Sequence, residues 1–418
     1  MSSKKRVAFA KAETTWHVNS NYLGMQKKPS TGPFPLLQRL DLVCFSHLRW
    51  DFVYQRPQHL LSRFAQHQRV FVLEEPIFHN APDKLHINEP VKNVFVAVPH
   101  LQVGTPHETV LQKQIDMVNN LISVMEINGY MAWYYTPMAL SFTAHLKPNL
   151  VVYDCMDELS AFKFAPPELK ENERLLLQKA DVVFTGGYSI YEAKKDKHPN
   201  IYPFPSSIDK EHFAQARGVT ADPTDQQAIP HPRFGFYGVL DERFDIDMIA
   251  AAAAMRPHWQ FVLIGPIVKI DPASLPKHSN IHYLGGKTYN ELPQYLSGWD
   301  VAMIPFAMNE STQYISPTKT PEYLAAGKPV ISTPIRDVVR PYADNKLVNI
   351  AANAEELVIH GDRILAQGTT EAWMQKVDAF LSGNSWDKTW AEMCKQIERK
   401  LQPQTTPSTT KSTATQYV

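Results

Sequence analysis

Short apolar runs alternate with stretches of helical periodicity along most of the chain. Brief apolar runs bounded by turns are typical of buried strands, and strands that alternate with helices are typical of parallel βαβ units. The pattern therefore predicts an α/β protein. The strands expected in the first half cover residues 42–45, 70–73, 94–98, 132–135, 151–153, 182–185 and 201–204, and those in the second half cover 234–237, 261–264, 281–284, 301–304, 329–332 and 348–350.

Amphipathic stripes predict the helices between these strands. Pro57 is suited to the first turn of a helix that turns Leu60 and Phe64 inward. The stretch 115–125 has one apolar face, and another helix is expected from Pro167 to about residue 180. Near the C-terminus, residues 386–401 carry an apolar stripe on a helix capped by Asn384 or Ser385.

The length of 418 residues favours two domains, because single cores stop growing at roughly 250–300 residues. Residues 217–232, rich in Asp, Thr, Gln and Pro, are expected to form the linker. The predicted organisation is an irregular arm over 1–36, a Rossmann-like domain over 37–216, the linker over 217–232, a second Rossmann-like domain over 233–385, a helix over 386–401 that crosses back to the first domain, and a disordered tail over 402–418.

Composition narrows the setting. Lys and Arg together number 42, as do Asp and Glu, so no global field recruits nucleic acid. Cys44, Cys155 and Cys394 are few and widely spaced, which suits buried thiols in a reducing cytoplasm. The N-terminal apolar run is too short for a signal peptide, and no long apolar stretch follows. We expect a cytoplasmic protein whose contact with a membrane is peripheral, at the inner face.

The segment 316–332 is the strongest functional signal. It places Lys319 and Glu322 on the first turn of a short helix that Gly327 ends. A helix N-terminus offers unpaired N–H groups and a positive dipole end to phosphates. Lys319 adds a cation for a diphosphate, and Glu322 can accept both hydroxyls of a ribose. The alternative is an ordinary connection between a helix and a strand, with a solvated Lys and Glu.

These residues resemble a known donor-site motif. Ser-Pro-x-Lys-x-x-Glu-Tyr followed by Ala-x-Gly-Lys-Pro-Val is similar to the motif of retaining GT-B glycosyltransferases, the group that includes sucrose and glycogen synthases. Within that group, the chain looks most similar over residues 40–401 to transferases of the teichuronic-acid type and others that build cell-surface polysaccharides. The resemblance implies a GT-B fold, with two Rossmann-like domains facing across a cleft, the donor on the second domain and the acceptor on the first.

One position departs from this motif. The group carries a second glutamate eight positions before the ribose-binding one, and Tyr314 stands there in this chain. Glu310, Gln313 and Ser316 are the candidate substitutes for contacts to the donor sugar.

A glycine turn follows the first strand of the second domain. Gly238 lets the backbone approach a ligand at the end of that strand. The turn resembles an element in which a basic side chain contacts the donor diphosphate, and Arg243 is the candidate, against the alternative of a surface arginine before a helix. Asp245 and Asp247 match the Asp-x-Asp metal pattern of GT-A enzymes, but a capped helix start explains the pair better. We expect no metal and no cofactor.

A cluster of acids follows the strand over 151–153. Asp154, Asp157 and Glu158 stand where such sheets present groups to the interdomain cleft. In the resembled transferases this loop often carries a His-Asp pair, and Asp157 aligns with the aspartate and Met156 with the histidine. Asp157 is therefore the candidate base, or the carboxylate that orients the acceptor hydroxyl. Solvated loop acids or helix caps are the alternative.

The loop after the first strand is the candidate acceptor site. Trp50 and Tyr54 could stack on a sugar, and Arg56 could meet a phosphate of a lipid-linked acceptor. Structural packing explains these residues equally well.

The motifs also exclude some functions. A glycine-rich dinucleotide fingerprint does not follow the first strand, and the sequence has no P-loop motif, which argues against a nicotinamide enzyme and a P-loop enzyme. The predicted function is transfer of a sugar from a nucleoside-diphosphate sugar, a UDP-sugar, to a saccharide or lipid-linked acceptor, with Asp157, Arg243 and Lys319 as catalytic residues and Gly238, Arg243, Ser316, Lys319 and Glu322 at the donor. A UDP-sugar 2-epimerase and a non-catalytic nucleotide-sugar-binding protein are the alternatives.

Overall fold

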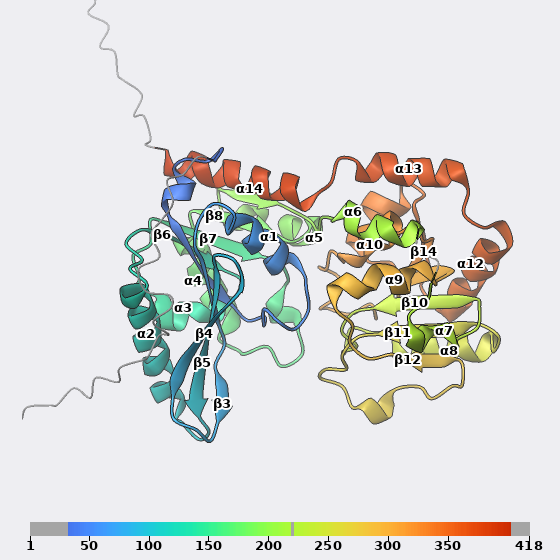
Figure 1. Cartoon of the computed structure of the whole chain (residues 1–418), viewed down its shortest axis with the longest axis horizontal. Coiled ribbons are helices and arrows are strands. Elements are labelled where there is room, and N and C mark those ends of the chain that lie inside the picture. Colours follow the sequence, from blue (N-terminus) through green and yellow to red (C-terminus); the bar gives the residue numbers. More distant parts are fainter. Residues whose placement is uncertain (1–31, 219–220, 403–418) are drawn as a thin grey trace, which may run out of the picture.

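The computed structural model describes residues 32–218 and 221–402. Most of the predicted arm over 1–36 and nearly all of the predicted tail over 402–418 lie outside the described residues. The described chain forms two halves, each built around its own sheet (Figure 1). We call them the first half and the second half. The predicted α/β class is confirmed.

The first half has a nine-stranded sheet in the order β3-β5-β2-β1-β6-β7-β8-β9, with β4 paired to β5. Its strands are β1 (Asp41–Ser46), β2 (Val70–Glu74), β3 (Ile77–His79), β4 (Lys84–Val91), β5 (Val94–Gln102), β6 (Tyr130–Tyr134), β7 (Leu150–Cys155), β8 (Val182–Thr185) and β9 (Ile201–Pro203). Its helices are α1 (Arg56–Phe64), α2 (His107–Val124), α3 (Leu140–Thr143), α4 (Leu169–Lys179), α5 (Tyr188–Lys194) and α6 (Lys210–Ala214).

The second half has a six-stranded parallel sheet in the order β12-β11-β10-β13-β14-β15. Its strands are β10 (Arg233–Tyr237), β11 (Gln260–Ile264), β12 (Ile281–Tyr283), β13 (Val301–Ile304), β14 (Val330–Ser332) and β15 (Val348–Ile350). The remaining helices are α7 (Thr224–Gln227), α8 (Ile246–Met255), α9 (Leu292–Ser297), α10 (Lys319–Ala325), α11 (Arg336–Val338), α12 (Ala354–Gln367), α13 (Glu371–Leu381) and α14 (Trp386–Leu401).

Every run predicted to be a strand overlaps an observed strand, with ends that differ by at most a few residues, but the sequence analysis missed β3 and β4. The expectation of parallel units alone was wrong here, because β4 runs antiparallel to β5. In β4, Leu85 and Ile87 are buried while Lys84, His86 and Asn88 are exposed. A strand with one solvated face alternates rather than forming a continuous apolar run.

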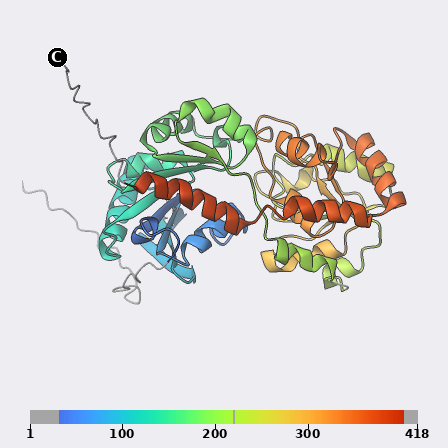
Figure 2. The ribbon, with the colours of Figure 1, turned by 90° about the horizontal axis from the view of Figure 1, so that it is seen from above.

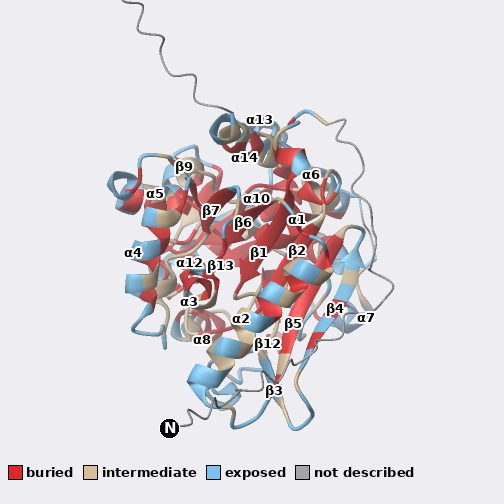
Figure 3. Cartoon of the chain, turned by 90° about the vertical axis from the view of Figure 1, so that its left-hand side faces the viewer, coloured by how far each residue is buried: buried red, intermediate tan, exposed pale blue. Residues whose placement is uncertain are grey.

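Most strands are apolar along their whole length because both faces of the sheet are covered. Figure 3 shows buried strands behind helices whose outer faces are exposed. The first sheet has a separate apolar cluster on each face, because neighbouring residues such as Val43 and Cys44 point to opposite sides. All three cysteines are buried free thiols, as predicted.

Helix α14 packs on the first half although it follows the second in sequence. Seen from above, α13 lies over the second half and α14 over the first (Figure 2). Trp386, Met393 and Ile397 of α14 are buried in the cluster that also holds Leu60. The cap is Ser385, whose side chain accepts from the backbone N–H of Lys388.

Polar contacts join the two halves. The backbone N–H of Ser189, at the start of α5, donates to Asp337 Oδ1 over 3.0 Å. Glu192, also on α5, pairs with Arg340 at 2.9 Å and with Arg336. Further contacts include the Ser206 hydroxyl donating to the Ser316 carbonyl over 2.6 Å, so α5 carries only part of the polar contact between the halves. Within the described residues, we find no helix long and apolar enough to span a bilayer.

Candidate active site

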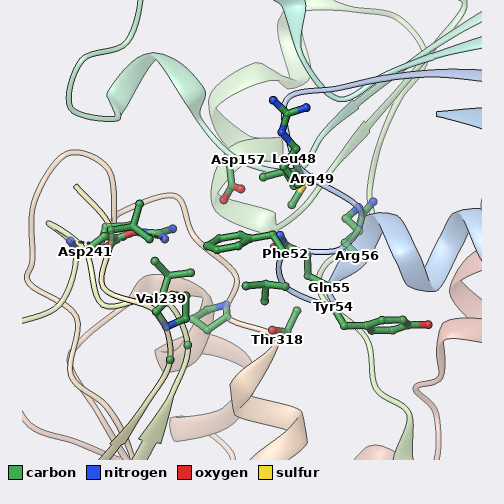
Figure 4. A pocket seen from close by; sticks show the side chains of 18 of the residues that line it. Leu48, Arg49, Phe52, Tyr54, Gln55, Arg56, Asp157, Val239, Asp241 and Thr318 are labelled. Carbon is green, nitrogen blue, oxygen red and sulfur yellow. Dashed lines mark hydrogen bonds and ion pairs between the residues drawn. The ribbon is translucent and has the colours of Figure 1, made fainter. Parts of the chain in front are cut away.

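A cavity of about 1420 Å³ lies between the two halves. The first half lines it with the β1–α1 loop and with the segments after β7. The second half lines it with the ends of β10 and β11, the loop over 286–292 and the start of α10. Figure 4 shows side chains from both halves converging on this space. The carboxyl ends of parallel strands thus face each other across it, the usual place for ligands in such sheets.

Helix α10 carries the predicted donor motif. It begins at Lys319, contains Glu322 in its first turn, and is followed by Gly327 at a φ of +76°. The helix is only seven residues long, and its dipole is correspondingly small. The side-chain cation therefore supplies most of the positive charge at this end of the helix.

Lys319 is the cation of the predicted donor site. Its ammonium lies 5.6 Å from the ring centres of both Phe236 and Phe306. Burial lowers the pKa of Lys319 to about 8, and the nearby Glu322 offsets part of this effect. A bound anion raises the pKa of such a lysine and so favours its charged form.

Glu322 is buried at the cavity wall, 6% exposed, so the alternative of a solvated Lys and Glu is wrong. The Tyr237 hydroxyl donates to its Oε2. Burial raises the pKa of Glu322 to about 7, while the Tyr237 hydrogen bond and Lys319 act in the opposite direction. The carboxyl group is therefore poised between its charged and neutral forms near pH 7.

Gly238 lies directly against Lys319. Its φ is +143°, and a Cβ at this position would come within 2.4 Å of Lys319 Cε. Gly265, at the end of β11, has a φ of +145°, and a Cβ there would come within 1.8 Å of the Gly238 carbonyl oxygen. The two glycines therefore let two strand ends and the lysine meet at one point. The sequence analysis identified Gly238 and missed Gly265.

Arg243 lines the same end of the cavity, paired with Asp241. Arg243 Nη2 lies 2.6 Å from Asp241 Oδ2, and Nε lies 3.0 Å from Oδ1. The guanidinium also lies 5.2 Å from the ring centre of Phe162 in the first half. Arg243 is thus held at the meeting point of the two halves, and the alternative of a free surface arginine is wrong.

The Asp-x-Asp pair behaves as a helix start. Asp245 caps α8, its side chain accepting from the backbone N–H of Met248 over 2.9 Å, and Asp247 is exposed on the first turn. Across the described parts of the chain, we find no group of three or more His, Cys, Asp or Glu residues placed to hold a metal ion.

The three acids after β7 have different surroundings. Asp154 is fully buried and paired with Arg56 at 2.8 Å, and Glu158 is paired with Lys194 at 2.7 Å. Asp157 is the one of the three that lines the cavity. The structure therefore singles out Asp157 from the cluster.

Asp157 faces the cations of the second half. Burial raises the pKa of Asp157, while Arg243, Arg56 and Lys319 act in the opposite direction. The thiol of Cys155 donates to the backbone carbonyl of Asp157 over 3.5 Å, which helps to fix the loop. Figure 4 shows the carboxylate of Asp157 pointing into the cavity from the first half.

The predicted acceptor residues line the cavity but differ in availability. Trp50 packs partly on the first-half core, and its backbone N–H donates to Glu74 Oε1 over 2.7 Å. Tyr54 stacks on Tyr289 of the second half, with ring centres 4.5 Å apart. Trp50 and Tyr54 thus form part of the cavity wall.

Arg56 requires a correction. It is 2% exposed, its Nε and Nη2 meet the Asp154 carboxylate, and its Nη1 donates to the Phe204 carbonyl over 2.7 Å. A guanidinium engaged in this way fixes the loop and strand end, so we no longer assign Arg56 to an acceptor phosphate.

The sequence analysis also missed two further cavity residues, Phe52 and His47. Phe52 is 50% exposed and extends into the cavity in Figure 4. His47 also lines the cavity, and burial lowers its pKa to about 4, so its imidazole is neutral at pH 7. In the sequence, Phe52 stands out only as an aromatic residue in a polar loop, and that signal does not separate it from Trp50.

Comparisons with known proteins agree with this architecture. Residues 231–382 match the family model described as glycosyl transferases group 1. Sucrose-phosphate synthase from Thermosynechococcus elongatus has a similar structure, with a TM-score of 0.64 and 17% identity over 87% of this chain and 99% of that one. A trehalose-6-phosphate protein from E. coli, bound with UDP-2-fluoro glucose, gives a TM-score of 0.62 and 12% identity over 86% of this chain and 99% of that one. HepE of Anabaena, in complex with UDP and glucose, gives a TM-score of 0.60 and 12% identity over 86% and 99%.

These findings define the class. The chain has the GT-B fold, and its residues 231–382 match the glycosyl transferases group 1 model. The chain is also 25% identical, over 255 residues, to TuaH of Bacillus subtilis (strain 168), which its name assigns provisionally to teichuronic acid biosynthesis as a glycosyltransferase. That match covers 55% of this chain and 64% of the relative's length.

Proposed function

We propose that the protein transfers a sugar from a UDP-sugar to a saccharide or lipid-linked acceptor in cell-surface polysaccharide synthesis, at the inner face of the membrane. One observation carries the proposal. Lys319 and Glu322 stand beside the Gly238 turn on one wall of the cavity, and Asp157 stands on the other. The UDP and glucose in the printed titles of similar structures, and the name of TuaH, support this choice of donor and pathway class.

The second half holds the donor in this proposal. Lys319 and Arg243 contact the diphosphate, and Glu322 accepts hydrogen bonds from the ribose hydroxyls. The hydroxyl of Tyr237, which donates to Glu322, fixes the orientation of that carboxylate. The glycine pair at residues 238 and 265 lets Lys319 approach the ends of β10 and β11, where the diphosphate binds in this proposal.

The first half holds the acceptor. Asp157 accepts a hydrogen bond from the acceptor hydroxyl and orients it, or takes its proton. The neutral imidazole of His47 offers a further hydrogen-bond acceptor, and Phe52 offers a flat apolar surface against which a sugar ring can stack.

The reaction breaks the bond between the anomeric carbon and the diphosphate oxygen and forms a bond from that carbon to the acceptor oxygen, with retention of configuration. Negative charge develops on the departing UDP. Lys319, which lies beside the rings of Phe236 and Phe306, and Arg243 stabilise that charge, so the transfer does not need a metal.

The direct test is release of UDP from a panel of UDP-hexoses, with and without a polyprenyl-linked monosaccharide as acceptor, in buffer containing EDTA. A transferase gives product that depends on the acceptor. Conversion of the donor without an acceptor would favour an epimerase, and binding without turnover would favour a non-catalytic protein. Loss of transfer in EDTA with recovery on adding Mn²⁺ would contradict metal independence.

A further inference from the structure

The motif expects a second carboxylate eight positions before Glu322, and this chain has none at that position. Tyr314 stands there, and its side chain packs against the core of the first half. Of the candidate substitutes Glu310, Gln313 and Ser316, Ser316 lines the cavity. A hydroxyl is a weaker acceptor than a carboxylate, so the donor sugar needs a charged partner from elsewhere.

Asp241 is a cavity-lining carboxylate to which the sequence analysis gave no role. It is 5% exposed, yet it reaches the cavity from the second half in Figure 4. Arg243 clamps it through Nη2 at 2.6 Å and Nε at 3.0 Å, and the backbone N–H of Arg243 donates to Oδ1 at 3.0 Å. The clamp keeps Asp241 in one orientation.

The backbone around Asp241 is fixed as well. Leu240 forms a parallel β-bridge with Ile267, and Phe244 forms an antiparallel bridge with Phe306. The backbone N–H of Ala307 donates to the Arg243 carbonyl over 2.7 Å. A carboxylate held by both its side-chain partner and its backbone presents a preorganised acceptor.

Asp241 also lies near Lys319 and Asp157, the two groups that must flank the donor sugar. Lys319 meets the chain at Gly238, three positions before Asp241, and Asp157 stands on the opposite wall. The negative charge of Asp241 raises the pKa of both Lys319 and Asp157, although burial dominates each shift. A sugar in transit from the diphosphate to the acceptor hydroxyl must occupy the space between these two residues.

We propose that Asp241, held by Arg243, accepts a hydrogen bond from a hydroxyl of the donor sugar and takes the place of the carboxylate that Tyr314 replaces. This inference rests on the proposed function and deepens it. Three N–H groups of Arg243 already donate to the Asp241 carboxylate, through four contacts. A carboxylate has about four lone-pair sites, so about one site of Asp241 stays open for the donor sugar.

The same geometry sets the class of sugar. A hexuronate would bring a third carboxylate to the space already faced by Asp157 and Asp241, and like charges repel strongly in a partly desolvated site. The donor is therefore an uncharged hexose rather than a hexuronic acid.

The test measures the affinities of UDP, UDP-glucose, UDP-galactose and UDP-glucuronate by calorimetry for wild type, Asp241→Asn and Asp247→Asn. In Asp241→Asn we expect the affinity for the preferred UDP-hexose to fall ten- to a hundredfold, the scale of a lost hydrogen bond to a charged group, while UDP affinity stays within about threefold. Asp247 is exposed and outside the cavity, so Asp247→Asn should match wild type.

A conservative variant keeps the test decisive if Asp241→Asn is unstable. Asp241→Glu retains the charge and can still pair with Arg243, but it moves the oxygens, so it should also weaken UDP-hexose binding relative to UDP. Equal loss of UDP and UDP-hexose affinity in both variants would mean that Asp241 only holds Arg243, and would overturn the inference. Preference of wild type for UDP-glucuronate would also overturn it. Failure of wild type to bind UDP at all would instead overturn the proposed function.

Discussion

The side chain of Lys319 lies so close to Gly238 that a single added carbon would collide with it. A Cβ at residue 238 would lie 2.4 Å from Lys319 Cε and 2.9 Å from its Nζ. The end of β10 and the first turn of α10 are thus fitted to one another. The position of the Lys319 ammonium depends on residue 238 having no side chain.

Replacing Gly238 by Ala should therefore displace Lys319 and strain the backbone, whose φ of +143° disfavours any residue with a Cβ. We expect UDP affinity to fall ten- to a hundredfold, as for loss of one charged hydrogen bond. Gly383→Ala is the matched control, because a Cβ there meets no atom within 4 Å. Calorimetry that gives Gly238→Ala the affinity of wild type would show that the contact does not matter for binding.

Asp157→Asn should reduce turnover about 10²- to 10⁴-fold, the contribution of a positioned base. Binding of UDP should be unchanged, because the donor contacts come from the second half. If Asp157 only orients the acceptor, the loss will be smaller. The exposed Asp116→Asn is the control for a lost charge elsewhere. Normal turnover in a folded Asp157→Asn variant would exclude both roles.

Binding of UDP should have a bell-shaped dependence on pH. Ribose hydroxyls donate to the ionised form of Glu322, whose pKa burial raises to about 7, so affinity should rise as the pH increases through this value. Burial lowers the pKa of Lys319 to about 8, so affinity should fall above that pH as the ammonium loses its charge. On the acid side, the titration of UDP itself and the ionisation of Glu322 both affect the affinity of wild type. Glu322→Gln should remove the contribution of Glu322 and leave that of UDP. Identical profiles for the two proteins would refute the assignment.

Much of the fold followed from the sequence, because buried parallel strands are apolar on both faces and their runs stand out. The edge strand β4 did not, since alternation of Leu85 and Ile87 with exposed residues resembles a loop as much as a strand. The same limit applies to the site. Lys319 and Gly238 were identified from a motif, but the contact between them, and the clamp of Arg243 on Asp241, depend on how separate strand ends meet.

Arg56 illustrates the same point in the other direction. Its sequence context, next to aromatic residues in a loop, was compatible with a phosphate ligand. Its partner Asp154 lies 98 positions away in sequence, and neither residue signals the other. β1 pairs with β6, and β6 pairs with β7. Only this strand order brings Asp154, near the end of β7, to Arg56, at the start of the helix that follows β1.

Arg56→Leu should destabilise the protein by about 3–5 kcal/mol, because it leaves the Asp154 carboxylate buried without its cation. The deficit should shrink as the pH falls towards about 4. Burial already raises the folded-state pKa of Asp154, and without Arg56 it rises further above the unfolded value of about 3.9, so the cost grows with pH above that value. The control is Arg256→Leu, which removes an exposed pair with Asp362 and should cost less than about 1 kcal/mol. Urea unfolding that gives equal losses for both variants would contradict the buried-pair account.

The central claim is that the start of α10 and the Gly238 turn bind UDP. Calorimetric titration of UDP into wild type, Lys319→Ala, Glu322→Ala and the exposed control Lys277→Ala tests it most directly. We predict that Lys277→Ala binds like wild type and that Lys319→Ala and Glu322→Ala each lose about ten- to a hundredfold in affinity. Unchanged UDP affinity in both Lys319→Ala and Glu322→Ala would contradict the account.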